Sequence, residues 1–334
     1  MILNRVIHTA DSHTEGNPTR VVLSGFGLIP GASIIQKRDY VRDHLDDLRR
    51  LILHEPRGGA LNCAVLMLDP CDPRADVAAV IMEQAEYVPM CGHCMIGLAT
   101  TLVELGLVEQ ESPSTTIVIE TVAGLVTASV DSSRGRAGAV TLQNVPSFVA
   151  AEEIALRLED GRVVTADISF GGDFYICVAA ADVDLQITPD SSSAIIQRAA
   201  DVRNAARDVV VRHPTRTDLD RAYMVLFYEE RSTSPLRYRN VIVAPPGAID
   251  RSPCGTGTSA MLARLHHLNL LGVGDTLINE GILGTTFLGR VSRLVDVGDI
   301  GGIVPEITGR AYMTGFHQWV LDPEDPFPGG FLLQ

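Results

Sequence analysis

Short segments rich in strand-forming residues recur along the chain, and Gly, Pro, Asp or Ser separates them. Such segments are typical of β-strands. They lie at 2–10, 20–26, 59–68, 115–121, 140–145, 167–179 and 222–230. Apolar residues recur instead with the spacing of a helix at 37–52, 94–107, 191–209 and 258–269. The pattern predicts an α+β chain in which each sheet wraps a central helix.

One apolar pattern occurs twice, about half the chain apart. CGHCMIGLATTLVELGL begins at Cys91 and CGTGTSAMLARLHHLNL begins at Cys254, each preceded by a nearby proline and a β-rich segment. The apolar positions that follow correspond in pairs: Ala99 and Ala263, Leu102 and Leu265, and Leu105 and Leu268. A duplicated domain is the economical explanation. We expect the boundary between the two copies near residue 125.

The repeated pattern places a cysteine at the start of each predicted helix. The positive end of the helix dipole lowers the pKa of a thiol there and favours the thiolate. Inverting an α-carbon requires a base on one face of the substrate and an acid of similar pKa on the other. A duplicated fold supplies such a pair, so we predict that Cys91 and Cys254 are the catalytic groups of a racemase or epimerase.

The same helix starts are candidates for binding the substrate. Removing an α-proton puts further negative charge on the adjacent carboxylate, which backbone N–H groups at helix N-termini can stabilise. The expected donors are the N–H groups of Gly92, His93, Gly255 and Thr256. Asp250 and His93 are the polar candidates to pair with the ammonium group or to orient the acid.

The composition excludes several classes of partner. The 334 residues carry 27 basic and 41 acidic side chains, a net charge of −14, whereas binding to nucleic acid or to an anionic membrane needs a basic face. No apolar run approaches the roughly 18–20 residues that span a bilayer. The first residues lack the basic and apolar blocks of a signal peptide, so we expect a cytoplasmic protein.

The remaining motifs favour neither a metal nor a cofactor. Cys91 and Cys94 form a Cys-x-x-Cys that resembles half a zinc site or a redox pair, but no second ligand pair follows at suitable spacing, and a redox pair leaves Cys254 unexplained. The glycine-rich 255–259 lacks the Lys-Ser/Thr ending of a phosphate loop. The other cysteines, Cys63, Cys71 and Cys177, are expected to be buried apolar residues. We predict no cofactor and no metal.

Seven motifs resemble those of proline racemases and hydroxyproline 2-epimerases. They are DSHTEGNPTRVV at 11–22, LHEPRGG at 53–59, MCGH at 90–93, FGGDFY at 170–175, DRSPCGTGTSA at 250–260, EGILGTTFLGRV at 280–291 and DPEDPF at 322–327. The resemblance implies two similar domains, 1–124 with about 312–334, and 125–311. Each would be a mostly antiparallel sheet wrapped around a central helix, with the active site in the cleft between the domains.

The resemblance also implies roles for individual residues. Cys91 and Cys254 would be the two bases, and the amides named above would bind a small imino acid together with Asp250. A homodimer is expected. An inactive relative would have lost a cysteine or Asp250, and this chain retains all three.

Several positions depart from the family pattern and bear on the substrate. Relatives that dehydrate trans-3-hydroxyproline typically carry threonine where this chain has Cys254, so the intact pair favours inversion and leaves dehydration as the alternative. Gly59 replaces a usual histidine, Asn62 and Cys63 replace bulkier residues, and Cys94 is unusual. These departures predict a roomier, more polar ring pocket. We expect a hydroxyproline to be preferred to proline, with Asn62 bonding the ring hydroxyl.

Overall fold

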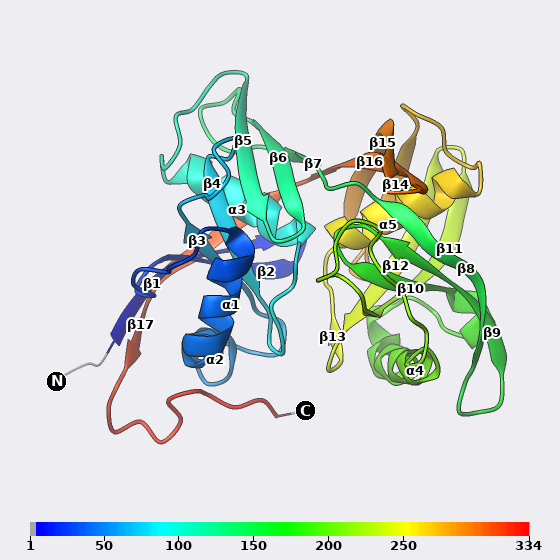
Figure 1. Ribbon diagram of the computed structural model, residues 1–334, viewed down its shortest axis with the longest axis horizontal. Coiled ribbons are helices and arrows are strands. Elements are labelled where there is room, and N and C mark those ends of the chain that lie inside the picture. Colours follow the sequence, from blue (N-terminus) through cyan, green and yellow to red (C-terminus); the bar gives the residue numbers. More distant parts are fainter. Residues whose placement is uncertain (1–4, 334) are drawn as a thin grey trace. The chain divides into compact units, whose positions relative to one another are not determined.

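The computed structural model describes residues 5–333 of the chain (Figure 1). Residues 2–4 of the first predicted strand and residue 334 of the first predicted domain lie outside this range. The chain divides into two compact units, Met1–Leu142 with Arg310–Gln334, and Gln143–Gly309. Each unit consists of a mixed sheet with few helices.

The first unit combines both ends of the chain in one sheet. Its strands are β1 (Arg5–Thr14), β2 (Asn17–Ser24), β3 (Cys63–Leu68), β4 (Val77–Met82), β5 (Ser114–Thr121), β6 (Gly124–Asp131) and β17 (Ala311–Leu321). Its helices are α1 (Ile34–His44), α2 (Asp46–Leu53) and α3 (Gly92–Glu104). The last strand, β17, pairs antiparallel with the first, β1, and so closes the unit.

The second unit is formed by one continuous stretch of chain, which follows β7 (Val140–Gln143) at the boundary. Its strands are β8 (Phe148–Arg157), β9 (Val163–Phe170), β10 (Phe174–Ala179), β11 (Ala222–Thr233), β12 (Leu236–Ala244), β13 (Ala248–Ile249), β14 (Thr276–Glu280), β15 (Thr286–Val297) and β16 (Ile300–Gly309). Its α-helices are α4 (Ser192–Ala205) and α5 (Gly255–His267).

The two units share one order of strand pairing. In the first unit β17, β1, β2, β3, β4, β5 and β6 pair in that order. In the second unit the corresponding order is β8, β9, β10, β11, β12, β14 and β15, with the same sequence of parallel and antiparallel pairs. In both units, antiparallel pairs are in the majority. A duplicated domain would produce this correspondence.

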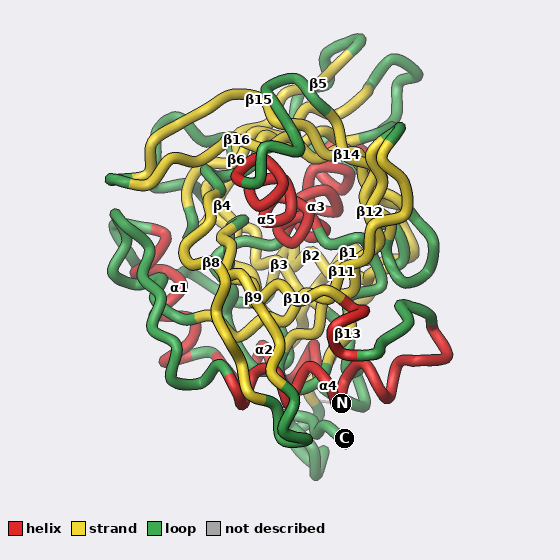
Figure 2. Tube along the Cα trace, turned by 90° about the vertical axis from the view of Figure 1, so that its right-hand side faces the viewer, coloured by secondary structure: helices red, strands yellow, loops and turns green. Residues whose placement is uncertain are grey.

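Each sheet surrounds one helix (Figure 2). The α3 helix packs against β1, β2, β6 and β17, and every residue of 92–103 is buried. The α5 helix packs against β8, β9, β15 and β16, and its first nine residues are buried. Both helices are therefore buried on all sides along most of their length, as in the core of a domain. The N-termini of these two enclosed helices carry Cys91 and Cys254.

The remaining α-helices complete the apolar core of each unit. The α1 and α2 helices contribute Val41, Leu48, Leu51 and Ile52 to a cluster with the sheet residues Ala64, Leu66 and Val80. The α4 helix contributes Ile195, Ala199 and Val202 to a cluster with Ile176, Val225 and Phe227. Each sheet therefore packs against an enclosed helix and against at least one further helix.

The helix predicted at 37–52 is wrong as a single element, because the structure has two helices there. Leu45 separates α1 from α2 with the non-helical angles φ −132° and ψ 16°. Asp46 and Asp47 lie in the first turn of α2, where the helix dipole favours negative charge. The apolar spacing continues across Leu45, so periodicity alone conceals the break.

The strand predicted at 167–179 is also two elements. β9 and β10 pair antiparallel, and the turn between them includes Gly172, whose φ of 116° is unfavourable for other residues. The strand predicted at 59–68 begins only at Cys63, because the preceding residues form a turn in which the Asn62 N–H donates to the Gly59 carbonyl at 3.1 Å. Asn62 therefore lies before the strand on which we had placed it.

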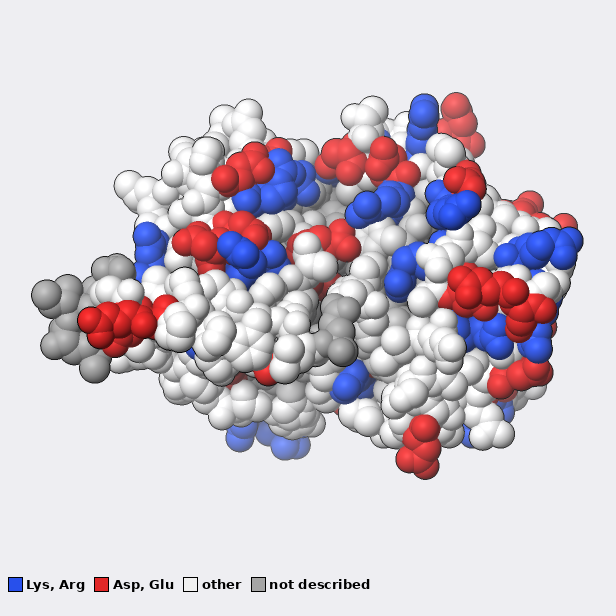
Figure 3. All heavy atoms as spheres, turned by 90° about the horizontal axis from the view of Figure 1, so that it is seen from below, with Lys and Arg blue, Asp and Glu red and all other residues white. Residues whose placement is uncertain are grey.

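Basic and acidic side chains are interspersed on the face of the molecule seen in Figure 3. Ion pairs among the charged residues of the chain include Arg162 with Asp184 at 2.7 Å and Arg198 with Asp201 at 3.0 Å. Among the described residues, no helix has the length and apolar character required to cross a membrane.

Candidate active site

Cys91 caps the N-terminus of α3. Its backbone is extended, with φ −144° and ψ 113°, and its carbonyl accepts the first helical hydrogen bond from the Met95 N–H at 3.0 Å. The residue is only 7% exposed. The first N–H groups of a helix have no acceptor within it, and in α3 these include the N–H groups of Gly92 and His93.

The ring of His93 lies against the Cys91 thiol. Nδ1 is 3.1 Å from Cys91 Sγ, and the side-chain amide of Asn17, at the start of β2, is 2.9 Å from Nε2. The Thr14 hydroxyl, at the end of β1, donates to the His93 carbonyl at 2.8 Å. Two strands of the first unit thus fix the position of a residue that the helix alone would leave free to rotate.

Cys91 and His93 stabilise each other in their charged forms. Burial raises the pKa of Cys91, but the hydrogen bond with Cys94 and the positive charge of His93 outweigh it, and the pKa lies below that of an ordinary thiol. Burial lowers the pKa of His93, yet the negative charge of Cys91 raises it well above its ordinary value. The pair therefore favours a thiolate next to an imidazolium.

Cys254 caps the N-terminus of α5 in a different backbone conformation. Its φ of 61° and ψ of 115° are rare for a residue with a side chain, and such a conformation costs about 1–3 kcal/mol. The Sγ atom accepts a hydrogen bond from the Gly257 N–H at 3.3 Å. A Cβ on Gly257 would lie 3.2 Å from this sulfur, so glycine suits the close approach.

Two hydroxyl groups lie close to the Cys254 sulfur. Tyr175 Oη is at 3.6 Å and Thr256 Oγ1 is at 3.5 Å, and the two hydroxyls are 2.5 Å apart. Burial and the negative charge of Asp250 raise the pKa of Cys254. Cys254 therefore remains a thiol under conditions in which Cys91 is a thiolate.

Asp250 is connected to Cys254 through Ser252. One carboxylate oxygen of Asp250 accepts hydrogen bonds from the Ser252 N–H and hydroxyl, both at 2.8 Å. The Ser252 hydroxyl oxygen accepts one from the Cys254 N–H at 3.0 Å. The segment from 250 to 254 is thus held by its own polar groups, which positions the half-buried carboxylate close to the thiol.

Tyr175, Ser252 and Asn17 contact the predicted residues but were not among them. Tyr175 and Ser252 lie within the FGGDFY and DRSPCGTGTSA motifs, and Asn17 lies within DSHTEGNPTRVV. Their place in these motifs is the signal that could have found them. Asn62 lies directly before Cys63, and its contact with a ring hydroxyl stays a prediction.

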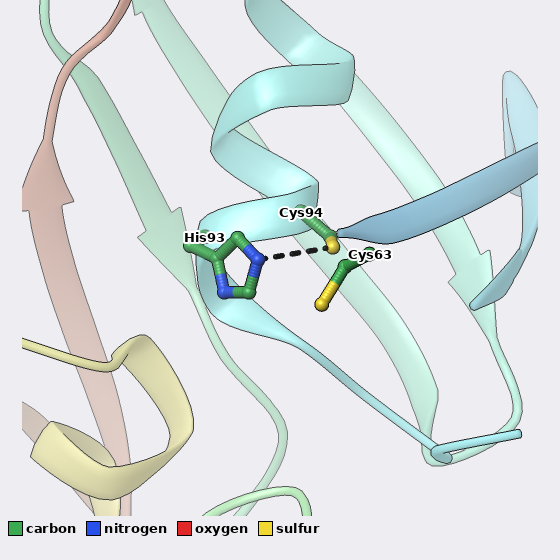
Figure 4. A group of neighbouring side chains, drawn as sticks. All are labelled: Cys63, His93 and Cys94. Atoms are coloured by element: carbon green, nitrogen blue, oxygen red, sulfur yellow. Dashed lines mark hydrogen bonds between the residues drawn. The ribbon is translucent and has the colours of Figure 1, made fainter. Parts of the chain in front are cut away.

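Two further cysteines lie near His93 at the start of α3. Cys63, His93 and Cys94 are buried, and their sulfur and ring nitrogen atoms lie within 4.8 Å of one another (Figure 4). Nε2 of His93 is 3.5 Å from Cys94 Sγ. No second ligand pair follows the Cys-x-x-Cys motif in the sequence. In the structure a further cysteine comes from upstream, Cys63 at the first residue of β3.

Comparison with known proteins decides the family. The family model for proline racemase matches residues 9–332. The chain is 38% identical to a proline racemase of Clostridioides difficile and 40% identical to a 4-hydroxyproline 2-epimerase of Streptosporangium roseum, in each case over the full length of both chains. The chain belongs to the proline racemase family. The family that the sequence motifs resemble is thereby confirmed.

The proline racemase fold is confirmed by a solved structure. A hydroxyproline epimerase of Agrobacterium vitis with bound trans-4-hydroxy-L-proline superimposes with a TM-score of 0.95 at 32% identity, over 100% of this chain and 96% of that one. The chain is also 35% identical to a trans-3-hydroxy-L-proline dehydratase of Burkholderia cenocepacia, over the full length of both chains. As a member related to racemases and epimerases, the chain is an enzyme of the isomerase class.

Proposed function

We propose that the chain inverts the α-carbon of a hydroxyproline, or of proline, with Cys91 and Cys254 as the two bases. The observation that carries this proposal is the pair of buried cysteines at the N-caps of the two enclosed helices, α3 and α5. Their surroundings support opposite protonation states, since His93 lies 3.1 Å from one sulfur and two hydroxyls lie near the other.

In the proposed reaction the Cys91 thiolate removes the α-proton and becomes a thiol. The electron pair of the broken C–H bond is delocalised into the substrate carboxylate. The Cys254 thiol then gives its proton to the opposite face of the α-carbon and becomes a thiolate. The reverse reaction exchanges these roles, and the proposal requires that the two sulfurs reach opposite faces of one substrate molecule.

The developing negative charge is assigned to the helix N-termini. The N–H groups of Gly92, His93, Gly255 and Thr256 would bind the two carboxylate oxygens. These amides provide positive potential within a chain whose net charge is −14. Asp250 would pair with the cationic ring nitrogen of the substrate.

We further propose two racemase domains, 1–124 with 312–334 and 125–311, with the active site between them. The compact units differ from these bounds, because 125–142 and 310–311 belong to the first unit. The shared order of strand pairing supports two related domains. A cytoplasmic homodimer is the assembly that we expect, and gel filtration with light scattering would measure its mass.

Hydroxyproline is proposed as the preferred substrate. The epimerases of S. roseum and A. vitis support this choice among relatives, and Asn62 supports it within the chain. Dehydration of trans-3-hydroxy-L-proline is the second candidate, because a dehydratase is among the relatives. Elimination needs only one face-specific base, so the presence of both cysteines favours inversion.

Incubation in D₂O with three substrates tests the proposal. L-Proline, trans-4-hydroxy-L-proline and trans-3-hydroxy-L-proline are followed by proton NMR. We expect the α-proton signal of trans-4-hydroxy-L-proline to fall as the 2-epimer carrying deuterium appears. An unsaturated product from trans-3-hydroxy-L-proline would establish the dehydratase instead. No change in any of the three would contradict both.

A further inference from the structure

Three side chains that come from two distant segments converge at the start of α3. Cys63 is the first residue of β3, and His93 and Cys94 belong to the first turn of α3. β3 pairs in parallel with β2, and Thr19 of β2 lies opposite Cys63 in the register. The Thr19 hydroxyl also donates to Cys94 Sγ at 4.0 Å. The fold of the first unit therefore builds this cluster.

The spacing of the donor atoms fits a tetrahedral metal ion. Zinc binds sulfur at about 2.3 Å and nitrogen at about 2.0–2.1 Å, so the edges of its coordination tetrahedron are about 3.5 Å for S···N and about 3.8 Å for S···S. The distance from His93 Nε2 to Cys94 Sγ is 3.5 Å. All three donor atoms lie within 4.8 Å of one another. The longer separations must therefore contract by at most about 1.3 Å for S···N and about 1 Å for S···S.

The chemistry of the cluster also suits a soft or borderline divalent ion. Two thiolates and one neutral imidazole neutralise the +2 charge of the ion. Neutralisation is important because an uncompensated charge is costly in a buried site, and here Cys94 is fully buried and His93 is 3% exposed. The Cys63 thiol donates towards a carboxylate oxygen of Glu83 at 3.8 Å. Metal binding releases the proton of each ligand. The proton of the Cys63 thiol can pass to this carboxylate, and those of the Cys94 thiol and of His93 Nε2 pass to solvent.

We propose that Cys63, His93 and Cys94 form a binding site for a thiophilic divalent metal ion, such as zinc, which inhibits the enzyme when it binds. The ion would replace the contact between the Asn17 amide and His93 Nε2. Three protein ligands leave one tetrahedral position open, and Cys91 Sγ lies 3.8 Å from the same ring nitrogen. The Cys91 sulfur would fill that position and be lost as a base.

Cobalt(II) is the probe that tests binding directly. Reduced protein under nitrogen is titrated with cobalt, and tetrahedral thiolate coordination is read from the sulfur-to-cobalt band in the near ultraviolet and the visible d–d bands. We expect one cobalt per chain in the wild type. Zinc should displace it. Cys63→Ser and Cys94→Ser should each weaken binding at least tenfold, as should Cys63→Ala and Cys94→Ala.

Cys71→Ser is the matched control, since Cys71 is in the same unit but outside the cluster. It should bind cobalt like the wild type, and circular dichroism melting of every variant checks that each is folded. A wild-type protein that gives only the weak spectrum of octahedral cobalt would overturn the site. So would a folded Cys63 variant that binds cobalt as Cys71→Ser does.

The proposal that metal binding inhibits turnover rests on the proposed function. The proposal that the cluster binds a metal does not, because the cobalt titration measures binding without turnover. Zinc should inhibit turnover by the wild type and by Cys71→Ser, and a chelator should restore it. At the same free zinc concentration, Cys63→Ser should lose a much smaller fraction of the activity that it shows without zinc. Equal inhibition of both variants would contradict the assigned link to Cys91. An inactive wild type with the expected cobalt spectrum would contradict the proposed function and leave the metal site supported.

Discussion

Glycine and alanine variants of Cys254 test whether the backbone at this helix start is strained. Cys254 has φ 61° and ψ 115°, whereas Cys91 at the corresponding position of α3 has φ −144° and ψ 113°. The rare conformation of Cys254 costs about 1–3 kcal/mol. Glycine removes this cost because it has no Cβ, while alanine keeps it.

Cys91 supplies the internal control for this comparison. Both cysteines are N-caps and are almost equally buried, at 7% and 6% exposure. Glycine is preferred to alanine at an N-cap. This preference contributes equally to the glycine–alanine difference at 91 and at 254, so it cancels when the two differences in unfolding free energy are compared. The advantage of glycine over alanine in unfolding free energy should therefore be larger at 254 than at 91 by about 1–3 kcal/mol.

Scanning calorimetry of the four variants measures this difference. For a unit of roughly 150–250 residues, 1 kcal/mol corresponds to about 2–4 °C in Tm. The gain in Tm from alanine to glycine should thus be several degrees larger at 254. Equal gains in Tm at 91 and 254 would show that the backbone of Cys254 is not strained. They would also contradict the view that the fold positions the Cys254 thiol at a cost to stability.

Three further predictions concern the site. Asp250→Asn should lower the pKa of Cys254, because burial and the negative charge of the Asp250 carboxylate both raise that pKa. Alkylation of Cys254 by iodoacetamide, followed by peptide mass spectrometry, should then begin at a lower pH. An unchanged pH profile would show that Asp250 does not raise the pKa of Cys254. Asn62→Leu should reduce the preference for trans-4-hydroxy-L-proline over L-proline in kcat/KM by about 1–3 kcal/mol, and an unchanged ratio would exclude Asn62. Mild oxidant should inactivate the enzyme reversibly through a disulfide between Cys91 and Cys254, and a mass spectrum with only a Cys91–Cys94 link would instead support a redox pair.

The two helix starts were predictable because their signals are local. A proline, a cysteine, a glycine and a following apolar period occur within about a dozen residues of each other around Cys91 and around Cys254. The structure places both residues at N-caps, one residue before the helix begins. The break at Leu45 was not predictable from periodicity, since the apolar positions of α1 and α2 remain in phase.

The partners of the two thiols depend on contacts that no local pattern contains. Tyr175 reaches Cys254 because the turn after β9 lies directly on α5, where a Cβ at Gly171 would be 2.1 Å from the Thr256 carbonyl oxygen. Cys63 reaches His93 because β3 pairs with β2 in one particular register. Only the assembled sheet determines these distances.

Turnover by Cys91→Ser and Cys254→Ser tests the central claim most directly. A serine hydroxyl is too weak an acid to share the role of a thiol, and a positioned acid or base contributes about 10²–10⁴-fold. Polarimetry with trans-4-hydroxy-L-proline should show a loss of at least this size in each variant, while Cys177→Ser, a buried cysteine of the second unit, should retain activity. Near wild-type turnover by either Cys91→Ser or Cys254→Ser would contradict the two-base mechanism.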